Sequence, residues 1–227
     1  MLFHGNKRGC MKKSVSKDSL ETVKIKHRDS NASKEKLLSA AKEVFSKYGF
    51  KGATTKMIAK KADMNESLIG RYFNGKYGLL ISLIEKLILE VRSIDLPYPA
   101  QETLDLELQA YCAFRIEHLM ANEGFFKIII SQSLTDPKFL KQARAKIPMD
   151  ADSPQLEARI KALHLAKKIH SAADLIQLVE DIEIHCMGVF FFQLVLKCED
   201  KGQIMKQLNN FIKTFSIAYE TSPNPSV

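Results

Sequence analysis

The sequence lacks the features that mark secreted, membrane-spanning and metal-binding proteins. Its four cysteines are scattered, without a C-x-x-C motif or closely paired histidines, so neither a disulfide framework nor a zinc site is indicated. The basic N-terminus has no apolar run of the length found in signal peptides. The most apolar stretch, residues 182–196, is shorter than the roughly 20 residues that a membrane span requires. We therefore expect a cytoplasmic protein with reduced thiols, no membrane partner and no bound metal.

Catalytic and β-strand signals are missing as well. The sequence contains no Gly-rich phosphate-binding loop, no nucleophile elbow and no H-E-x-x-H motif. His164 and His170 are six residues apart, which does not place them on one helix face as metal ligands. No run of alternating β-branched residues indicates a strand. We therefore predict an all-α protein that is not an enzyme and needs no cofactor.

What the chain has instead is an uneven distribution of positive charge within a net charge of +8. Residues 1–32 hold eight Lys or Arg against three Asp or Glu, residues 33–76 hold ten against four, and residues 77–227 hold sixteen against nineteen. The positive excess lies in the first third, so we infer an N-terminal part that faces a polyanion and a C-terminal part with another task. A merely solvated, lysine-rich surface is the alternative explanation.

The N-terminal third is predicted to contain a basic arm and a helix-turn-helix. Residues 1–30 are polar and lack periodicity, so we predict a disordered basic arm there, with Met11 as an alternative start. A helix that ends at Gly49 follows. Two short helices, joined only by residues 63–65, then form a helix-turn-helix over 54–73. This unit needs the first helix to cover its apolar side. The apolar face of the first helix consists of Leu37, Leu38, Ala41, Val44, Phe45 and Tyr48.

The remaining chain is predicted to form a longer helix and then a separate helical domain. An apolar stripe ends at Val91, and the segment DLPYP at 95–99 separates a DNA-binding domain at 31–91 from a C-terminal domain at 97–222. The last two helices are apolar nearly all round, so we expect the same pair from a second copy to cover them in a C2 homodimer, with burial in the chain's own core as the alternative. The predicted dimer-interface residues are Leu178, Ile182, Phe190, Phe191, Leu194, Leu208, Phe211 and Phe215.

The outward side of the second short helix suits the readout of DNA bases. A recognition helix enters the major groove and contacts base edges with side chains near its start. Asn65 either caps this helix or pairs with adenine, Glu66 can accept from cytosine, and Arg71 can hold guanine or a phosphate. Residues 54–56 and Lys76, at the starts of neighbouring helices, suit phosphate contacts. The predicted DNA-binding residues are Thr54, Thr55, Lys56, Asn65, Glu66, Ser67, Leu68, Arg71 and Lys76.

Three stretches carry a resemblance to a known family. They are AAKEVFSKYGF in the first helix, IAKKADMNESLI across the two short helices and RYFNGKYGLL at the start of the next helix. With them, residues 31–91 resemble the N-terminal DNA-binding domain of the TetR (tetracycline repressor) family of bacterial regulators. The resemblance implies an all-helical homodimer that binds a palindromic operator, as a rule a repressor, and that responds when a small molecule enters the C-terminal domain. It also implies DNA contacts at Thr54, Lys56, Asn65, Ser67, Leu68, Arg71, Tyr72 and Lys76.

Two positions depart from the family pattern. The family usually has Gly in the turn where this chain has Asp63, a residue type that tolerates positive φ, so we expect the turn to form. An aromatic residue usually stands where this chain has Gly70, which removes one expected phosphate contact. Gly at this position also costs the recognition helix about 1 kcal/mol relative to Ala.

The resulting hypothesis is a ligand-responsive transcriptional regulator in the bacterial cytoplasm, associated with the nucleoid. Its competitor is a sequence-indifferent DNA-coating protein, for which the basic arm would suffice. The pocket for the effector would be lined by aromatic, His and Met side chains of the C-terminal helices, although ordinary core packing explains the same residues. These candidates are Phe114, His118, Phe125, Phe126, His164, His185 and Met187.

Overall fold

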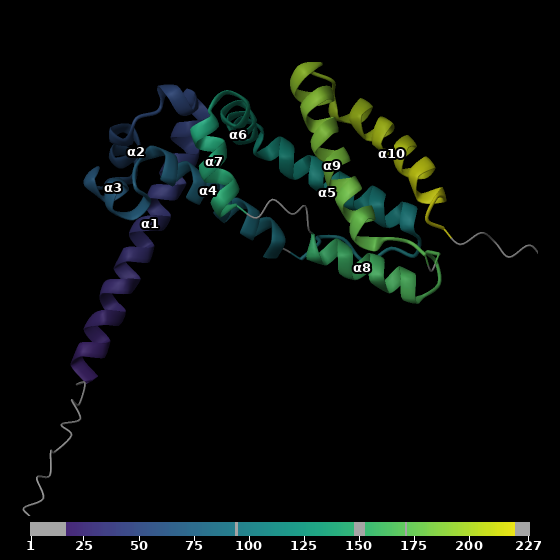
Figure 1. The fold of residues 1–227 in the computed structure, drawn as a ribbon, viewed down its shortest axis with the longest axis horizontal. Helices are drawn as coiled ribbons and strands as arrows, with labels where there is room; N and C mark the ends of the chain where they lie inside the picture. Colours follow the sequence, from purple (N-terminus) through teal and green to yellow (C-terminus); the bar gives the residue numbers. More distant parts are fainter. Residues whose placement is uncertain (1–16, 94, 148–152, 171, 221–227) are drawn as a thin grey trace, which may run out of the picture.

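The computed structural model describes residues 17–93, 95–147, 153–170 and 172–220, with side chains from Ser30 onward. This part of the chain is helical and contains no β-strand, only an isolated antiparallel bridge between Ile169 and Glu220. The all-α prediction is therefore confirmed (Figure 1). The helices are α1 (Lys17–Gly52), α2 (Thr55–Ala62), α3 (Ser67–Phe73), α4 (Lys76–Ser93), α5 (Leu104–Ala121), α6 (Glu123–Thr135), α7 (Pro137–Lys146), α8 (Pro154–Leu165), α9 (Leu175–Val189), the π-helix η1 (Phe190–Leu196) and α10 (Lys201–Ile217).

Helix α1 is longer than predicted. It begins at Lys17, so residues 17–30, for which we predicted a disordered arm, are helical, while residues 1–16 lie outside the described part. No Gly or Pro occurs between Lys17 and Tyr48, so this stretch contains no strong helix breaker. Gly49 has φ 67° and kinks the helix just before its last residues. The predicted stop signal at Gly49 therefore acts as a kink.

Two buried cores divide the molecule, and they do not follow the chain break at 95–99. The first core joins α1 to α4 with residues of α6 and α7, including Phe125 and Phe139. The second core joins α5, α8, α9, η1 and α10. Figure 1 shows α6 and α7 lying with the N-terminal helices and the other C-terminal helices lying apart. We call the first unit the head (α1 to α4, α6 and α7) and the second the body (α5, α8, α9, η1 and α10).

The head core is built from the predicted helical stripes. Leu37, Phe45, Ile58, Ile69 and Leu79 are fully buried, one or two from each of α1 to α4. Burying each such side chain stabilises the fold by about 1.5–3 kcal/mol in transfer free energy. Because α2 and α3 are short, they depend on this shared core to stay folded. The core leaves their polar sides in solvent.

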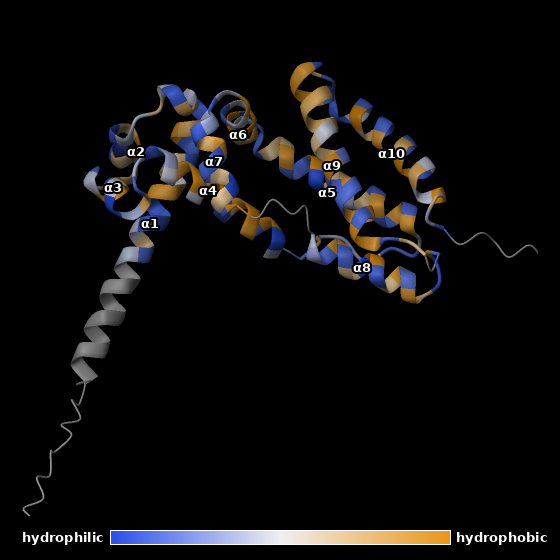
Figure 2. Ribbon diagram, viewed as in Figure 1, coloured by the Kyte–Doolittle hydropathy of each residue, from blue (hydrophilic) through white to orange (hydrophobic). Residues whose placement is uncertain are grey.

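The body carries the most apolar helices of the chain. Helix α9 continues without a break into η1, and the upper end of this rod in Figure 2 is coloured as hydrophobic. Within the described residues, no helix is long and apolar enough to cross a membrane. The apolar surface at the end of the rod belongs to Phe192 and Leu196, which are both 58% exposed. The body thus presents apolar side chains to its surroundings as well as to its core.

Candidate nucleic-acid interface

The turn between α2 and α3 forms as predicted, although it lacks Gly. Asp63 has the left-handed conformation, with φ 52° and ψ 51°, which confirms that Asp replaces the usual Gly at this place. The N–H of Asp63 donates to the Lys60 carbonyl (3.2 Å) and the N–H of Met64 donates to the Ala59 carbonyl (3.0 Å). These two bonds satisfy carbonyls at the end of α2 and reverse the chain into α3.

Thr54 and Thr55 fix the start of α2 and connect it to α3. The hydroxyl oxygen of Thr54 accepts from the Met57 N–H (3.1 Å), which makes Thr54 the N-cap. The Thr55 hydroxyl donates to the Glu66 carboxylate (2.6 Å). The two predicted contact regions, the start of α2 and the start of α3, are thereby held side by side. Glu66 has one carboxylate oxygen engaged in this bond.

Asn65 caps the start of the recognition helix α3, because Glu66, which directly precedes Ser67, already has helical φ and ψ (−56° and −33°). Its side-chain oxygen accepts from the Ser67 N–H (2.8 Å), so of the two roles considered for Asn65 the structure shows the cap. This bond uses the amide oxygen and leaves both N–H donors of the side chain to other partners. Ser67 and Arg71 are exposed on the same short helix. Asn65, Ser67 and Arg71 therefore offer donors near the start and along the outer side of α3.

Tyr72 and Leu68 lie at the margin of the head core rather than fully outside it. Both are partly buried and pack against the core of the head. The ammonium of Lys34, on α1, lies 5.7 Å from the centre of the Tyr72 ring, and the Arg71 guanidinium lies 6.0 Å from it. Such cation–π contacts attach α1 and Arg71 to the ring. The interface is therefore flanked by α1.

Lys76 makes contacts that its sequence position did not indicate. Its ammonium donates to the carbonyls of Phe50 (2.8 Å) and Ala53 (2.9 Å) and lies 4.5 Å from the centre of the Phe50 ring. Partial burial lowers the pKa of Lys76. We predicted a phosphate contact for this residue. In the free protein the ammonium instead connects α4 to the end of α1.

Gly78 permits a close contact that sequence analysis missed. A Cβ atom at this position would lie 1.6 Å from the carbonyl oxygen of Phe73, the last residue of α3. The turn between α3 and α4 runs through Asn74 (φ 59°) and Gly75 (φ 96°) and brings the two backbones together. The only available signal was an isolated Gly in a strongly helical pattern, which usually has a packing reason. Gly78 thus sets how closely α4 supports the recognition helix.

Helix α6 belongs to both cores. Phe125 is buried in the head core, whereas its neighbour Phe126 packs against the body, with its ring centre 5.8 Å from that of Phe190 and 6.4 Å from that of His118. A second link lies within the head, where the Tyr77 hydroxyl of α4 donates to Asp136, the N-cap of α7 (2.7 Å). This bond lowers the pKa of Asp136 and raises that of Tyr77. Displacement of α6 or α7 would therefore act on α4.

The predicted pocket residues are distributed over both cores, and the pocket itself stays a prediction. Phe125 is core of the head, and Phe114, Phe126 and Met187 pack against the body core. His118 contacts Phe126, as described above, while His185 stacks on Phe211 with ring centres 3.6 Å apart. Burial lowers the pKa of both His118 and His185. His164 lies on α8, and its Nδ1 atom is buried without a hydrogen-bond partner among the described residues.

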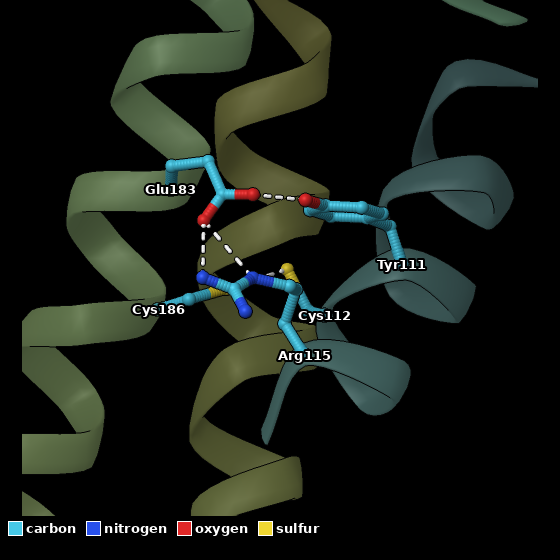
Figure 3. A network of polar contacts seen from close by, with 5 residues as sticks. All are labelled: Tyr111, Cys112, Arg115, Glu183 and Cys186. Atoms are coloured by element: carbon cyan, nitrogen blue, oxygen red, sulfur yellow. Dashed lines mark hydrogen bonds and ion pairs between the residues drawn. The ribbon is translucent and has the colours of Figure 1, made fainter. Parts of the chain in front are cut away.

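A buried polar network, which sequence analysis also missed, joins α5 and α9 in the body (Figure 3). The Arg115 guanidinium donates to Glu183 from Nε (3.0 Å) and from Nη2 (2.8 Å), and Tyr111 donates to the other carboxylate oxygen. Both charged side chains are only 11% exposed. Next to them the sulfur atoms of Cys112 and Cys186 lie 3.4 Å apart. Burial and the Glu183 charge raise the pKa of Tyr111. The network holds two helices whose remaining contacts are apolar.

The predicted dimer-interface residues divide into two groups. Leu178, Ile182, Phe190 and Leu208 are fully buried in the body's own core, which is the alternative considered for the surplus apolar surface, so they cannot contact a second copy directly. Phe191, Leu194, Phe211 and Phe215 are partly buried. The outer side of α9 and η1 instead forms a groove of about 520 Å³. It is lined by Ile184, His185, Gly188, Val189, Phe192, Gln193 and Lys197.

A family profile and two curated regulators match parts of the chain. A family profile described as bacterial regulatory proteins, tetR family, matches residues 37–83. A Bacillus subtilis protein named as the probable HTH-type transcriptional regulator YttP is 38% identical over 55 residues, which cover 24% of this chain and 27% of YttP. The helix-turn-helix transcriptional repressor NicS of Pseudomonas putida is 27% identical over 116 residues, which cover 48% of this chain and 52% of NicS. The chain thus spans about a quarter and about half of the length of these curated relatives.

Solved structures match the fold over most of the chain. A TetR-family transcriptional regulator from Rhodococcus sp. superimposes with a TM-score of 0.65 at 12% identity, covering 81% of this chain and 98% of that one. Salmonella enterica GusR superimposes with a TM-score of 0.59 at 16% identity, covering 82% and 96%. At this identity the likeness concerns the fold, in which an N-terminal helix-turn-helix is followed by a helical domain.

Proposed function

With this N-terminal domain the chain belongs to the TetR family of bacterial transcriptional regulators, and on that basis we propose that it binds a palindromic operator as a homodimer, represses transcription and responds to a small molecule. The observation that carries the proposal is the solvent-facing start of α3. Asn65 caps it, the Thr55–Glu66 bond ties it to α2, and its apolar side is buried in the head. This rigid support is what base readout in the major groove requires.

We assign different tasks to the residues of the interface. Arg71, Ser67 and the free amide donors of Asn65 read base edges, because they are exposed along the outer side of α3. Lys56 and the hydroxyl groups of the adjacent threonines contact phosphates at the start of α2. Lys76 supports the interface from behind through its two carbonyl bonds. Phosphate contacts fix the register of α3, and base contacts select the sequence.

A second copy of the chain is the proposed occupant of the groove on α9 and η1. The groove is lined by the exposed side chains of Ile184 (59% exposed) and Phe192 (58%), and Leu196 on the same π-helix as Phe192 is also 58% exposed. Exposed apolar surface of this kind marks an interaction site. Pairing of two chains across a two-fold axis buries this surface and gives a dimer with two heads. Half-sites about 34–36 Å apart, or a multiple of that, are then read together. Such a dimer works on DNA in the bacterial cytoplasm.

The response to a small molecule is proposed to pass through α6. This helix contributes Phe125 to the head core and Phe126 to the body, so a ligand that rearranges the body also shifts the support of α4. The ligand must bind the dimer more tightly when its two heads are at one spacing than when they are at another. About 5.5 kcal/mol of preference is needed to change the ratio of two states from 1:99 to 99:1.

The test is selection of DNA by the full chain, followed by titration. Duplexes of random sequence are bound, recovered and sequenced, and the affinity of the recovered sequence is measured between about 50 and 200 mM salt. A palindrome that is preferred over unrelated DNA supports the proposal. Equal affinity for all duplexes, with one common salt slope, would instead identify a sequence-indifferent DNA-coating protein.

Two substitutions separate readout from charge. Arg71→Ala should weaken operator binding by about 1–3 kcal/mol and relax selectivity at one position of each half-site. Lys206→Ala, which removes an exposed positive charge from α10, is the matched control and should leave the affinity unchanged. Equal effects of the two variants would contradict a role of α3 in base readout.

A further inference from the structure

We propose that Cys112 and Cys186 form a site of reversible oxidation, at which a peroxide converts two buried thiols into a disulfide that joins α5 to α9. Neither residue takes part in the proposed function, and the inference does not depend on DNA binding. No local pattern in the sequence indicated the pair, because the two cysteines lie 74 residues apart. Where disulfides form in cytosolic proteins they are mostly transient and serve catalysis or redox sensing.

The packing of α5 on α9 brings the two sulfur atoms into contact. The Cys186 thiol donates to the Cys112 sulfur over 3.4 Å, and both side chains are fully buried. Beside them Arg115 donates to Glu183, so the two pairs form successive links between the same two helices (Figure 3). Arg115 follows Cys112 by three residues and Glu183 precedes Cys186 by three, which is about one helical turn on each side. The buried ion pair therefore holds the helices in the register that places sulfur opposite sulfur.

The two sulfur atoms need only a short approach to form a bond. A disulfide has an S–S length of about 2.05 Å, so the sulfurs must move together by about 1.4 Å. The contact with Cys186 and burial raise the pKa of Cys112, and the charge of Arg115 opposes this rise only in part. The reactive thiolate is therefore rare, and we expect the first step to be slow and to occur when the body opens locally. The second step is fast, because the partner thiol is already in place.

The reaction balances with one molecule of hydrogen peroxide as the oxidant. One sulfur, as the thiolate, attacks a peroxide oxygen and becomes a sulfenic acid, while the O–O bond breaks and the released hydroxide forms water with the thiol proton. The second sulfur then attacks the sulfenic sulfur, which forms the S–S bond and expels a hydroxide that takes up the second thiol proton. Two thiols and one peroxide thus give one disulfide and two waters, with both electrons supplied by the sulfurs. A dithiol reductant reverses the bond by exchange.

The experiment compares two full-length variants that keep two thiols each. In the first, Cys10→Ser and Cys198→Ser leave the facing pair untouched. In the second, Cys10→Ser and Cys112→Ala leave Cys186 and Cys198, of which Cys198 is exposed and lies beyond the end of η1. Each folded variant is incubated with hydrogen peroxide, then unfolded and analysed by mass spectrometry, by labelling of free thiols and by non-reducing electrophoresis. Circular dichroism before the oxidation verifies that both variants fold.

The first variant should lose two hydrogen atoms in mass, show no free thiol, run as a single chain and return to its starting mass with dithiothreitol. Its midpoint of thermal unfolding should rise by about 5–15 °C on oxidation, because the bond closes a long loop of the unfolded chain. The second variant should instead gain oxygen or form chain dimers through Cys198. Free thiols that persist in the first variant, or oxygen added to them in place of a bond, would overturn the inference. A midpoint that does not rise would also overturn it, because the packed helices would then not suit the bond.

Discussion

The head and the body of this protein are stabilised in different ways. In the head, side chains cap the helix ends and connect neighbouring elements, as Thr54, Asn65 and Lys76 do. Helix ends are capped by side chains in the body as well, but its apolar helices also surround two buried ion pairs, Arg115–Glu183 and Arg159–Glu107. Gln193 and Asn209 have buried side-chain oxygens without partners among the described residues. The head is therefore organised before it meets DNA. The body retains polar groups that a rearrangement or a ligand can satisfy, and it is the part that we expect to change shape.

The largest expected effect tests how tightly the head is built. Gly78→Ala places a methyl group against the Phe73 carbonyl and should destabilise the protein by on the order of 5 kcal/mol, with loss of DNA binding. Gly70→Ala is the matched control within α3, because its new methyl group has nothing within 4 Å. It should stabilise the protein by about 1 kcal/mol. Urea unfolding of both variants provides the measurement, and similar behaviour of the two would contradict the close α3–α4 contact.

The next effect concerns the body. Arg115→Met leaves the Glu183 carboxylate buried without its positively charged partner, with only the Tyr111 hydroxyl still donating to it, and should cost about 3–5 kcal/mol of stability. The double variant Arg115→Met with Glu183→Leu removes both charges and should recover most of that loss. Chemical denaturation of the single and double variants is the measurement. A double variant as unstable as the single variant would contradict this, because it would show that the ion pair stabilises the body beyond neutralising its own two buried charges.

A smaller effect separates support from DNA contact within the head. Lys76→Met removes two hydrogen bonds to backbone carbonyls and should lower the free energy of unfolding by about 2 kcal/mol. Lys56→Met, at an exposed position of α2, should change stability by less than about 0.5 kcal/mol while weakening DNA binding. Thermal unfolding and DNA titration are measured on both. Unfolding data that rank the two in the opposite order would refute the supporting role of Lys76.

The smallest effect is a pH dependence in the body. Burial lowers the pKa of His118, and the nearby charges of Arg115 and Lys42 act in the same direction. As the pH falls through about 6.5, the unfolded chain takes up the proton more readily than the folded chain, so stability decreases. His118→Gln should lose less stability than the parent between about pH 7 and pH 5. Thermal unfolding at both pH values measures the difference, and the loss that remains in His118→Gln includes the contribution of His185. An equal loss of stability in His118→Gln and in the parent would contradict the assignment of this pH dependence to His118.

Local signals in the sequence predicted the head better than the body. The helical stripes and the left-handed Asp63 depend on a few neighbouring residues, and the structure confirms them except at Tyr48, which was placed on an apolar face and is 47% exposed. Lys76 donates to Phe50, which is 26 residues away, and no local pattern encodes that contact. Gly78 lies against the nearby Phe73, and its only signal was an isolated Gly in a helical pattern. The DNA-contact list remains a prediction.

In the body, apolar composition did not distinguish the inner side of a helix from the outer side. Leu178 and Ile182 proved to be core, while Ile184 on the same helix faces outward. A helix that is hydrophobic nearly all round contains no clear stripe, so its orientation depends on the neighbours that it meets. The Arg115–Glu183 pair was hidden for a related reason, since its partners lie 68 residues apart. The predicted domain boundary at 95–99 failed to anticipate that α6 and α7 return to the head.

The dual membership of α6 determines where this protein can be divided for engineering. A chimera joined just after α4 would remove Phe125, Ile128 and Phe139 and leave the apolar surface of the DNA-reading unit uncovered. A version of that unit that can be transferred must include the helices up to Lys146. Otherwise the domain that is joined to it must supply two helices equivalent to α6 and α7. Designers of hybrid biosensors therefore need a transplanted sensing module whose own α6 carries adjacent aromatic residues facing in both directions.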